Sequence, residues 1–206
     1  MIGNKRACSF GDISTTSFFP AKPLGCYGDG GAVFTDNDEW AALADSYRVH
    51  GKGMFKYDNV RIGMNSRLDT LQAAILKIKF KAFREYELRD INKAAALYTR
   101  LLAGRVKTPV TPEGYYSSWA QYTICLNSRE ERDALQACLK EQGIPSMVYY
   151  PTPMHGQTAY KALNAPTDCC PTAKRLCDTV LSLPVHPYIT EEEIETVCSV
   201  ILGFVR

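Results

Sequence analysis

Apolar residues recur along the chain at two spacings, one typical of strands and the other typical of helices. The run GAVFT at 31–35 predicts a buried strand, and the glycines and prolines before it predict tight turns. A later set shares one face at helical spacing and predicts an amphipathic helix: Leu68, Leu71, Ile75 and Ile78. The helical pattern continues, with a predicted break near Asp90, to Leu102, and Gly104 is expected to end it.

Helix starts are predicted where a polar side chain can cap the first turn and an acidic residue follows three positions later. Four pairs of residues have this spacing: Asp36 with Glu39, Ser66 with Asp69, Ser128 with Glu131, and Thr190 with Glu193. The helices that these pairs begin are expected to cover 39–50, 66–102, 128–143 and 190–204.

Strands alternate with helices in the second half of the chain as well. Residues 106–127 are predicted to form a loop and then a strand, and residues 144–153 a strand that ends in prolines. Residues 172–184 are predicted to form a helix that leads into a short extended segment. The alternation indicates an α/β or α+β fold, and the change in composition after Gly104 predicts two domains that meet there.

The composition of the 206 residues, with 46% hydrophobic and 22% charged, is that of an ordinary globular protein. The net charge of +2, with no basic run interleaved with aromatic residues, argues against a nucleic-acid partner. No apolar run approaches the length of a membrane span, and the N-terminal sequence MIGNKRACSFGD has no signal-peptide core. We therefore expect a cytoplasmic protein with no membrane partner.

The spacing of the eight cysteines predicts no metal site. No two of them have the C-x-x-C spacing, and the three histidines are scattered along the sequence. With no secretory signal, most of the cysteines are expected to be reduced thiols.

A single lysine stands in the tetrapeptide PAKP, where the two prolines restrict the backbone on both sides of Lys22. Phe18 and Phe19 would give the amine an apolar setting, which favours the neutral form that attacks a carbonyl carbon. These features suit a lysine that forms a Schiff base. The alternative from the tetrapeptide alone is a solvated surface lysine in a proline-rich turn.

Four segments occur in the order in which a known family has them. GDISTTSFFPAKPLGCYGDGGAVFT, at 11–35, strongly resembles the lysine segment of the sugar-nucleotide aminotransferases of the DegT/StrS family. The other matches are GMNSRLDTLQAAIL at 63–76, YYPTPMHGQTAY at 149–160 and SLPVHPYIT at 182–190. The likeness is greatest to members that act on UDP-linked 3-keto hexuronic acids, and AQYTI at 120–124 contributes to it.

The resemblance implies an α/β enzyme of fold type I that depends on pyridoxal 5′-phosphate (PLP). Residues 1–104 would be the C-terminal portion of the PLP-binding large domain, with part of a mixed sheet, and 105–206 a small α+β domain. Lys22 would form the Schiff base and then move a proton during transamination. Ser17 would hydrogen-bond the cofactor phosphate, whereas without the resemblance it reads as a turn hydroxyl.

Two residues of the second matching segment have roles in the family. Asn65 corresponds to an asparagine that crosses a homodimer interface to the partner's cofactor phosphate, although Asn also suits a helix cap. Arg67 would bind a substrate carboxylate or phosphate in a bidentate manner, or it would simply pair with Asp69.

The third segment resembles the substrate-facing loop of the family, which places Tyr149, Tyr150 and His155 among the candidate substrate-binding residues. A tyrosine-rich strand end is otherwise ordinary core. His186, in LPVHP, reads as structural. The implied substrates are a keto sugar nucleotide and an amino-acid donor, with glutamate expected, in polysaccharide or amino-sugar biosynthesis. The sequence does not fix which keto sugar is used or which carbon receives the amine.

The family enzyme is longer than this chain. The part expected before Met1 would supply the glycine turn that binds phosphate, the aromatic residue on the cofactor ring and an aspartate at the ring nitrogen. In the family this aspartate stands in an acidic E-D-x-A-Q stretch, which the chain lacks. We therefore expect little or no aminotransferase activity from this chain alone.

Two alternatives remain open. Dehydrating relatives replace the lysine by histidine, so Lys22 favours transamination. The other is a catalytically inactive fragment that acts at most as a dimerisation or binding module.

Overall fold

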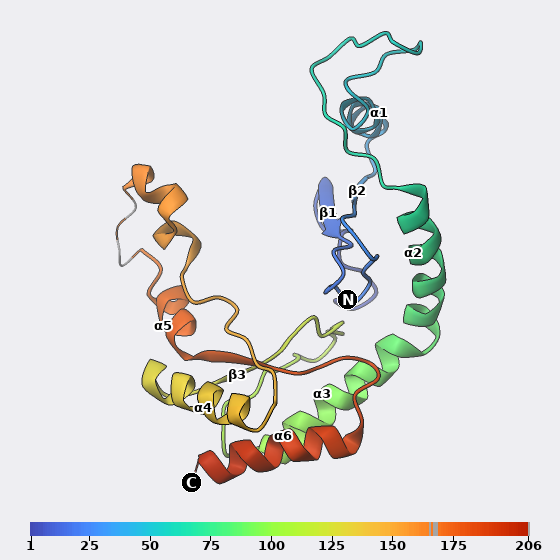
Figure 1. The fold of residues 1–206 in the computed structure, drawn as a ribbon. Helices are drawn as coiled ribbons and strands as arrows, with labels where there is room; N and C mark the ends of the chain where they lie inside the picture. Colours follow the sequence, from blue (N-terminus) through green and yellow to red (C-terminus); the bar gives the residue numbers. More distant parts are fainter. Residues whose placement is uncertain (165, 167–168, 206) are drawn as a thin grey trace. The chain divides into compact units, whose positions relative to one another are not determined.

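The structure is a computed structural model that describes residues 1–164, 166 and 169–205. The chain forms two compact units (Figure 1). The first consists of Met1–Glu87 with Thr111–Ser117, and the second of Leu88–Val110 with Ser118–Arg206. This division falls before Gly104, because the helix between the two positions packs within the second unit. The domain boundary near Gly104 stays a prediction.

The first unit contains one antiparallel strand pair and two α-helices. Its elements are β1 (Ile13–Ser17), β2 (Gly31–Thr35), α1 (Asp38–Tyr47), α2 (Thr70–Ala82) and the π-helical turn η1 (Phe83–Glu87). The register pairs Ile13 with Thr35 and Ser17 with Gly31. The strand predicted at 31–35 is thus confirmed, although its burial is only partial.

Both capping residues predicted for the first unit are wrong. The cap of α1 is Asn37, whose Oδ1 accepts a hydrogen bond from the Trp40 backbone N–H at 3.0 Å, so Asp36 lies one residue too early. Asp69 itself, rather than Ser66, holds the N-cap position of α2, and its side chain makes no capping hydrogen bond. Residues 64–66 are instead extended against the end of α1, which delays the start of α2.

The helix break predicted near Asp90 is present but lies a few residues earlier. The irregular turn is η1, between α2 and α3 (Leu88–Leu102). Asp90 fits inside α3 because its carboxylate points to the surface and pairs with Arg89 and Lys93, at 2.9 and 3.0 Å. Gly104 follows α3 with a φ of +73°, the left-handed conformation in which glycine commonly ends a helix.

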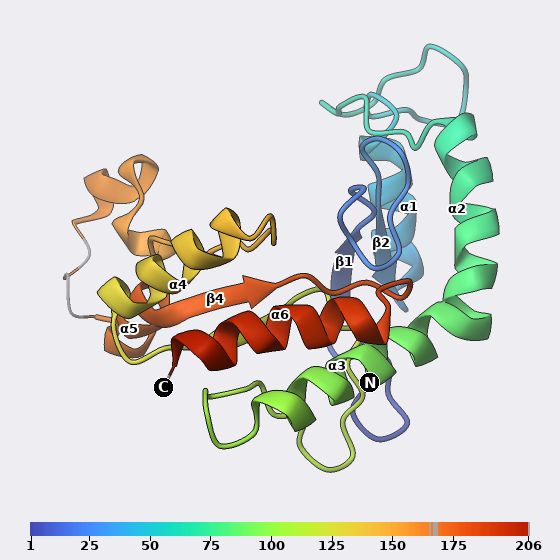
Figure 2. The same cartoon turned by 60° about the horizontal axis from the view of Figure 1, so that its bottom comes forward.

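The second unit surrounds another antiparallel strand pair with helices (Figure 2). In addition to α3 it contains β3 (Tyr122–Cys125), α4 (Arg129–Glu141), the 3₁₀ turns η2 (Met154–Gly156) and η3 (Thr158–Leu163), α5 (Pro171–Thr179), β4 (Val180–Leu183) and α6 (Glu191–Phe204). The register pairs Tyr122 with Leu183 and Cys125 with Val180. α6 packs against α3 and α4, and α4 also contacts α5 and β4.

The predicted starts of α4 and α6 are confirmed. Ser128 Oγ accepts a hydrogen bond from the Glu131 N–H, and Thr190 forms a reciprocal capping box with Glu193. The strand predicted at 144–153 is wrong. Only Met147 bridges to β4, through two hydrogen bonds with Ser182, because the prolines of this segment lack the N–H that a ladder needs.

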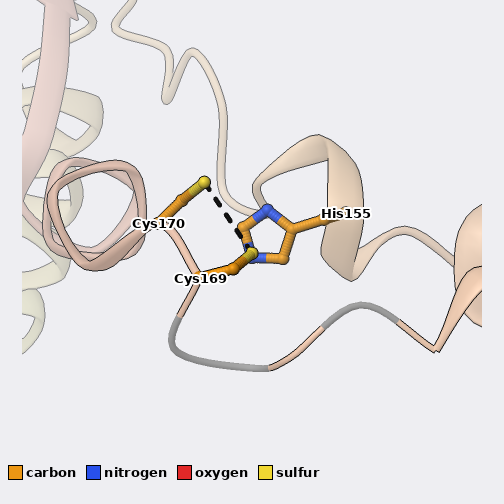
Figure 3. Close-up of side chains that lie close together, drawn as sticks. All are labelled: His155, Cys169 and Cys170. Atoms are coloured by element: carbon orange, nitrogen blue, oxygen red, sulfur yellow. Dashed lines mark hydrogen bonds between the residues drawn. The ribbon is translucent and has the colours of Figure 1, made fainter.

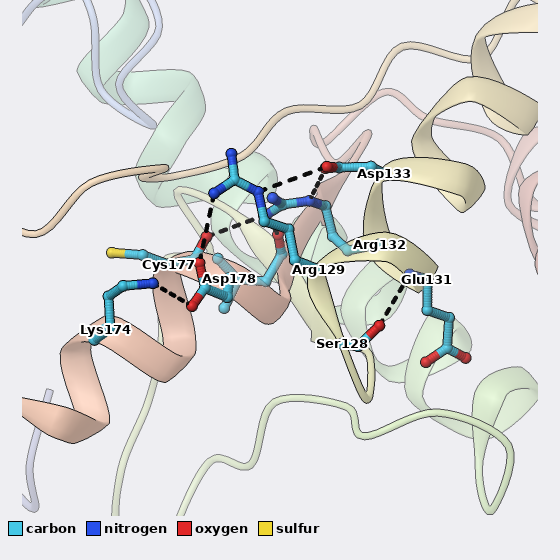
Figure 4. A network of polar contacts seen from close by, with 9 residues as sticks. Ser128, Arg129, Glu131, Arg132, Asp133, Lys174, Cys177 and Asp178 are labelled. Atoms are coloured by element: carbon cyan, nitrogen blue, oxygen red, sulfur yellow. Dashed lines mark hydrogen bonds and ion pairs between the residues drawn. The ribbon is translucent and has the colours of Figure 1, made fainter.

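A contiguous apolar core fills the second unit. Its largest fully buried side chains come from α3, the strand pair, α4 and α6: Tyr98, Leu102, Tyr122, Ile124, Leu135, Leu139, Leu181, Ile194 and Ile201. Arg132 of α4 is also buried and donates through Nη1 to the carbonyl oxygens of Cys177 and Val180, at 3.2 and 3.3 Å. Figure 4 shows how Arg132, through Cys177, and Arg129, through Asp178, join α4 to α5. This unit therefore has the packing of a stable domain.

The first unit has almost no such core. Of its described hydrophobic residues, only Cys26 and Leu76 are buried. The apolar residues predicted to share a helix face do lie largely on α2, but two of them, Leu71 and Ile78, are 69% and 75% exposed. The helix was correctly predicted and its burial was not, because amphipathic spacing does not say what covers a face. Within the described residues, no helix combines the length and apolar character needed to cross a membrane.

Candidate functional site

Lys22 lies on the loop of residues 18–30 that joins β1 to β2. Hydrogen bonds between its ends close this loop. The Phe18 N–H donates to the Gly30 carbonyl at 2.7 Å, and the Cys26 N–H donates to the Phe18 carbonyl at 2.8 Å. The buried Cys26 thiol donates to the same Phe18 oxygen at 3.0 Å. The Tyr27 N–H is held at 2.8 Å by the Gln72 side chain of α2.

The turn that carries Lys22 is tight. The Lys22 N–H donates to the Phe19 carbonyl at 2.8 Å. A Cβ at Gly25 would lie only 2.6 Å from that same Phe19 oxygen and 2.7 Å from the Pro20 oxygen, so the turn requires glycine there. The backbone at Lys22 is therefore fixed, as the sequence predicts. The described residues do not form the apolar setting expected for its amine, since Lys22 and Phe19 are both exposed.

Ser17 is the last residue of β1, at the end of the strand pair that leads into the Lys22 loop. Its hydroxyl is exposed, and its Oγ accepts a hydrogen bond from the Phe19 N–H at 3.2 Å. Ser17 therefore makes the local hydrogen bond expected of a hydroxyl in a turn, which was the alternative interpretation of this residue. Because that bond uses the oxygen as acceptor, the hydroxyl hydrogen can still donate to a phosphate. An exposed hydroxyl donor at the end of β1 and an exposed primary amine on the loop that follows are groups that suit PLP.

Asn65 and Arg67 follow a strand-like pairing with the residues after α1. Asn65 forms a backbone bridge with Val49, and its side chain is not a helix cap, because α2 begins only at Thr70. Arg67 Nε donates to Asn65 Oδ1 at 2.9 Å. The alternative pairing of Arg67 with Asp69 does not occur among the described residues. The exposed Asn65 amide is thus oriented by Arg67.

The backbone beneath Asn65 depends on a glycine whose importance sequence reasoning missed. A Cβ at Gly63 would overlap the Gly51 nitrogen and lie 2.7 Å from the Tyr47 oxygen, both backbone atoms. The Met64 N–H donates to that Tyr47 oxygen at 2.8 Å. The only signal for this residue was its place in the segment GMNSRLD.

The remaining candidates lie in the second unit. Tyr149 and Tyr150 have ring centroids 5.4 Å apart in an edge-on arrangement, and they are 42% and 66% exposed, so they are not core residues. His155 is partly buried in the turn η2. His186 Nδ1 accepts a hydrogen bond from the Tyr188 N–H at 3.2 Å, which agrees with a structural role. The structure thus brings Ser17, Lys22, Asn65 and Arg67 into one unit and the other three candidates into the second.

Comparison with known proteins identifies the family. Residues 1–202 match the model of the DegT/DnrJ/EryC1/StrS aminotransferase family. The chain belongs to this family. Its enzymes depend on PLP, and the structure of NtdA from Bacillus subtilis, with the cofactor PMP bound, resembles this chain with a TM-score of 0.87. NtdA is 26% identical, and the match covers 98% of this chain and 47% of NtdA.

Two further relatives are more similar in sequence. UDP-2-acetamido-2-deoxy-3-oxo-D-glucuronate aminotransferase of Pseudomonas aeruginosa is 42% identical over 95% of this chain and 52% of its own length. A DegT/DnrJ/EryC1/StrS aminotransferase from Brucella abortus is 46% identical, with a TM-score of 0.92 over 99% of this chain and 54% of its own. The chain therefore spans about half the length of the relatives that it matches.

Proposed function

We propose that this chain is the lysine-bearing part of a PLP-dependent aminotransferase that acts on a keto sugar nucleotide. The observation that carries the proposal is the Lys22 loop, which holds an exposed amine on a fixed turn five residues after an exposed hydroxyl at Ser17. Membership of the family supports the same role for both residues.

Each residue has a definite task in this proposal. PLP, when bound, supplies the electron sink that stabilises the carbanion of transamination. The Lys22 amine holds the cofactor covalently and then transfers the substrate proton, for which it must be neutral. Ser17 donates its hydroxyl hydrogen to the phosphate. Asn65 serves the phosphate of a partner subunit in a homodimer, with its amide oriented by Arg67.

The substrate is proposed from the relatives. The name of the Pseudomonas aeruginosa enzyme specifies a UDP-linked 3-oxo-glucuronate, which supports a UDP-linked 3-keto hexuronic acid here, with glutamate as donor. Arg67 then has a carboxylate to bind, since its guanidinium can form two parallel hydrogen bonds to one. The exposed Tyr149, Tyr150 and His155 would contact the sugar nucleotide. The product would enter amino-sugar or polysaccharide biosynthesis in the cytoplasm.

A second candidate function is that of a non-catalytic module. It is favoured by the first unit, where only Cys26 and Leu76 are buried hydrophobic residues and much of α2 is uncovered. Exposed apolar side chains that are contiguous over a large area normally contact another protein surface. On this view the uncovered faces bind the rest of a longer enzyme or a second subunit.

Cofactor binding is tested with PLP and borohydride. The chain is mixed with PLP, its visible spectrum is recorded, and borohydride then fixes any Schiff base for peptide mapping. We expect one labelled residue, Lys22, with the label lost in Lys22→Ala and kept in the surface control Lys140→Ala. Labelling spread over many lysines would favour the non-catalytic module.

Turnover is tested separately. The chain alone, with PLP, glutamate and the UDP-linked keto sugar, is expected to show little or no activity. A chimera that adds the unmatched part of the Pseudomonas aeruginosa relative is expected to be active, and its Lys22→Ala variant inactive. Full activity of the chain alone would contradict the first expectation, and an inactive but soluble chimera would contradict the second.

A further inference from the structure

The second unit brings a histidine beside two consecutive cysteines from a later segment of the chain. His155 of η2, Cys169 and Cys170 at the start of α5 place one ligand atom each within 4.8 Å of one another (Figure 3). The sequence predicted no metal site, because no two cysteines have the C-x-x-C spacing and the histidines are scattered along the chain. The fold supplies the histidine from a different segment.

The distances suit a single metal ion. The two sulfur atoms are 3.8 Å apart, and the two cysteines are not joined by a disulfide. Two thiolates that bind one tetrahedral zinc ion at about 2.3 Å each have their sulfur atoms about 3.8 Å apart. A disulfide would instead require a separation of about 2.05 Å.

The surroundings leave the cluster open to a metal ion. Cys170 is the N-cap residue of α5, and its side chain makes no capping hydrogen bond. Both cysteines are exposed and His155 is partly buried, so a metal ion can reach the cluster from solvent.

We propose that His155, Cys169 and Cys170 bind a zinc ion. Two thiolates and an imidazole form a ligand set that selects zinc over magnesium or calcium, which prefer oxygen ligands. Three protein ligands leave a fourth position of the tetrahedron for water or an added ligand. The ion joins η2 to the start of α5. It also occupies the imidazole that the proposed function assigns to the sugar nucleotide, so metal and substrate compete for His155.

The experiment uses Co²⁺ as a spectroscopic probe and Zn²⁺ as its competitor, with the whole chain under reducing conditions. We expect one Co²⁺ per chain, with the sulfur-to-metal charge-transfer absorption of two thiolates, displaced by one equivalent of Zn²⁺. Because thiols must lose protons to bind, affinity should fall as the pH is lowered.

Variants separate this cluster from the other cysteines. Cys169→Ser with Cys170→Ser should abolish the charge-transfer band, and His155→Gln should weaken binding roughly tenfold or more while keeping the band. Cys138→Ser, on α4, is the matched control and should bind as the unaltered chain does. The proposal is overturned if the unaltered chain shows no thiolate band or if the double variant retains it. These readings need neither PLP nor turnover, so they are independent of the proposed function.

Discussion

The turn at Lys22 shows how one residue without a side chain can fix another. Gly25 packs against the carbonyl groups of Phe19 and Pro20, and the same Phe19 carbonyl accepts the Lys22 N–H. Both contacts involve backbone atoms, which cannot move aside as a flexible side chain can. The position of the amine thus depends on a residue that would never contact the cofactor.

Gly25→Ala is expected to open this turn. The added Cβ would meet two backbone oxygens at 2.6 and 2.7 Å, so the hydrogen bonds of the Lys22 and Cys26 amides should be lost. Amide hydrogen exchange, read by NMR, should show both amides exchanging faster. Gly203→Ala in α6, where a Cβ meets nothing within 4 Å, should leave them unchanged. Unchanged protection in Gly25→Ala would contradict this account.

Two stacked tyrosines in the core of the second unit differ in one hydrogen bond. Tyr98 and Tyr122 have ring centroids 5.0 Å apart and are fully buried. The Tyr122 hydroxyl bonds to Thr99 Oγ1 at 2.7 Å, whereas the Tyr98 hydroxyl has no partner among the described residues. Burial raises the pKa of Tyr98 far above its ordinary value. An unpaired buried hydroxyl costs about 1–3 kcal/mol of stability.

Tyr98→Phe should therefore leave the free energy of unfolding of the second unit unchanged or raise it by about 1 kcal/mol. Tyr122→Phe instead removes a hydroxyl that is hydrogen-bonded to Thr99 Oγ1, so it should lower that free energy by about 1 kcal/mol, although Thr99 keeps its bond to the Ala95 carbonyl. Urea unfolding of the two variants measures the difference. Equal effects of both substitutions would contradict the assignment of the unpaired hydroxyl.

Among the elements, α6 has the most complete start. The Glu193 N–H donates to Thr190 Oγ1 at 3.2 Å, and the Thr190 N–H donates to Glu193 Oε2 at 2.8 Å. The backbone hydrogen bond from Thr190 is the main cause that lowers the pKa of Glu193 below its ordinary value. Because α6 packs against α3 and α4, loss of its first turn should lower the stability of the whole core.

Thr190→Ala should destabilise the second unit by about 1 kcal/mol, because one helix N–H loses its partner. Thr196→Ala is the control, since Thr196 is exposed on the same helix and alanine is the better helix former. Thermal and urea unfolding should place the control at or above the unaltered chain. A control as destabilised as Thr190→Ala would show that the cap is not the cause.

The surface of α3 gives an expected pH dependence. Hydrogen bonds from Arg89 and then Lys93 lower the pKa of Asp90 to about 2, from an ordinary value of 3.8. A pKa lowered by folding stabilises the folded state above pH 3.8, and this stabilisation is lost as the pH falls towards 2. Asp90→Asn should therefore reduce the pH dependence of stability between pH 4 and 2, measured by urea unfolding. Glu141→Gln, at the exposed end of α4, controls for the loss of one charge.

For the whole molecule, the two units differ in how much of their apolar surface is covered. The second has a contiguous core formed by residues of three helices (α3, α4 and α6) and a strand pair. The first exposes Leu71 and Ile78 on α2 and buries few hydrophobic residues anywhere. Burial of apolar surface is the main source of folding free energy, at about 25 cal/mol per Å². The two units should therefore differ widely in stability.

Native-state hydrogen exchange should show this difference. Amides of α3, β3 and α6 are expected to exchange only through global opening of the second unit, and those of α2 at least about tenfold faster. In the proposed chimera, α2 should gain protection because its apolar face is covered. Equal protection of both units in the isolated chain would contradict the inferred lack of a core.

By itself, the sequence determined features that depend on neighbouring residues. The caps of α4 and α6, the end of α3 at Gly104 and the helix–strand succession from α5 to β4 follow from local hydrogen bonding and periodicity. The ordered motifs around Lys22 also identified the family. Local signals failed at the start of α2, which a backbone pairing of residues 64–66 delays, and at residues 144–153, where only Met147 bridges to β4.

Only the tertiary structure decided which faces are covered and which distant residues meet. Spacing made α2 amphipathic but could not reveal that Leu71 is exposed, because burial depends on a second surface. It also could not place His155 beside Cys169 and Cys170, because that contact joins separate segments of the chain. The sequence thus fixes local conformation and family, whereas three-dimensional packing decides where surface and ligand groups gather.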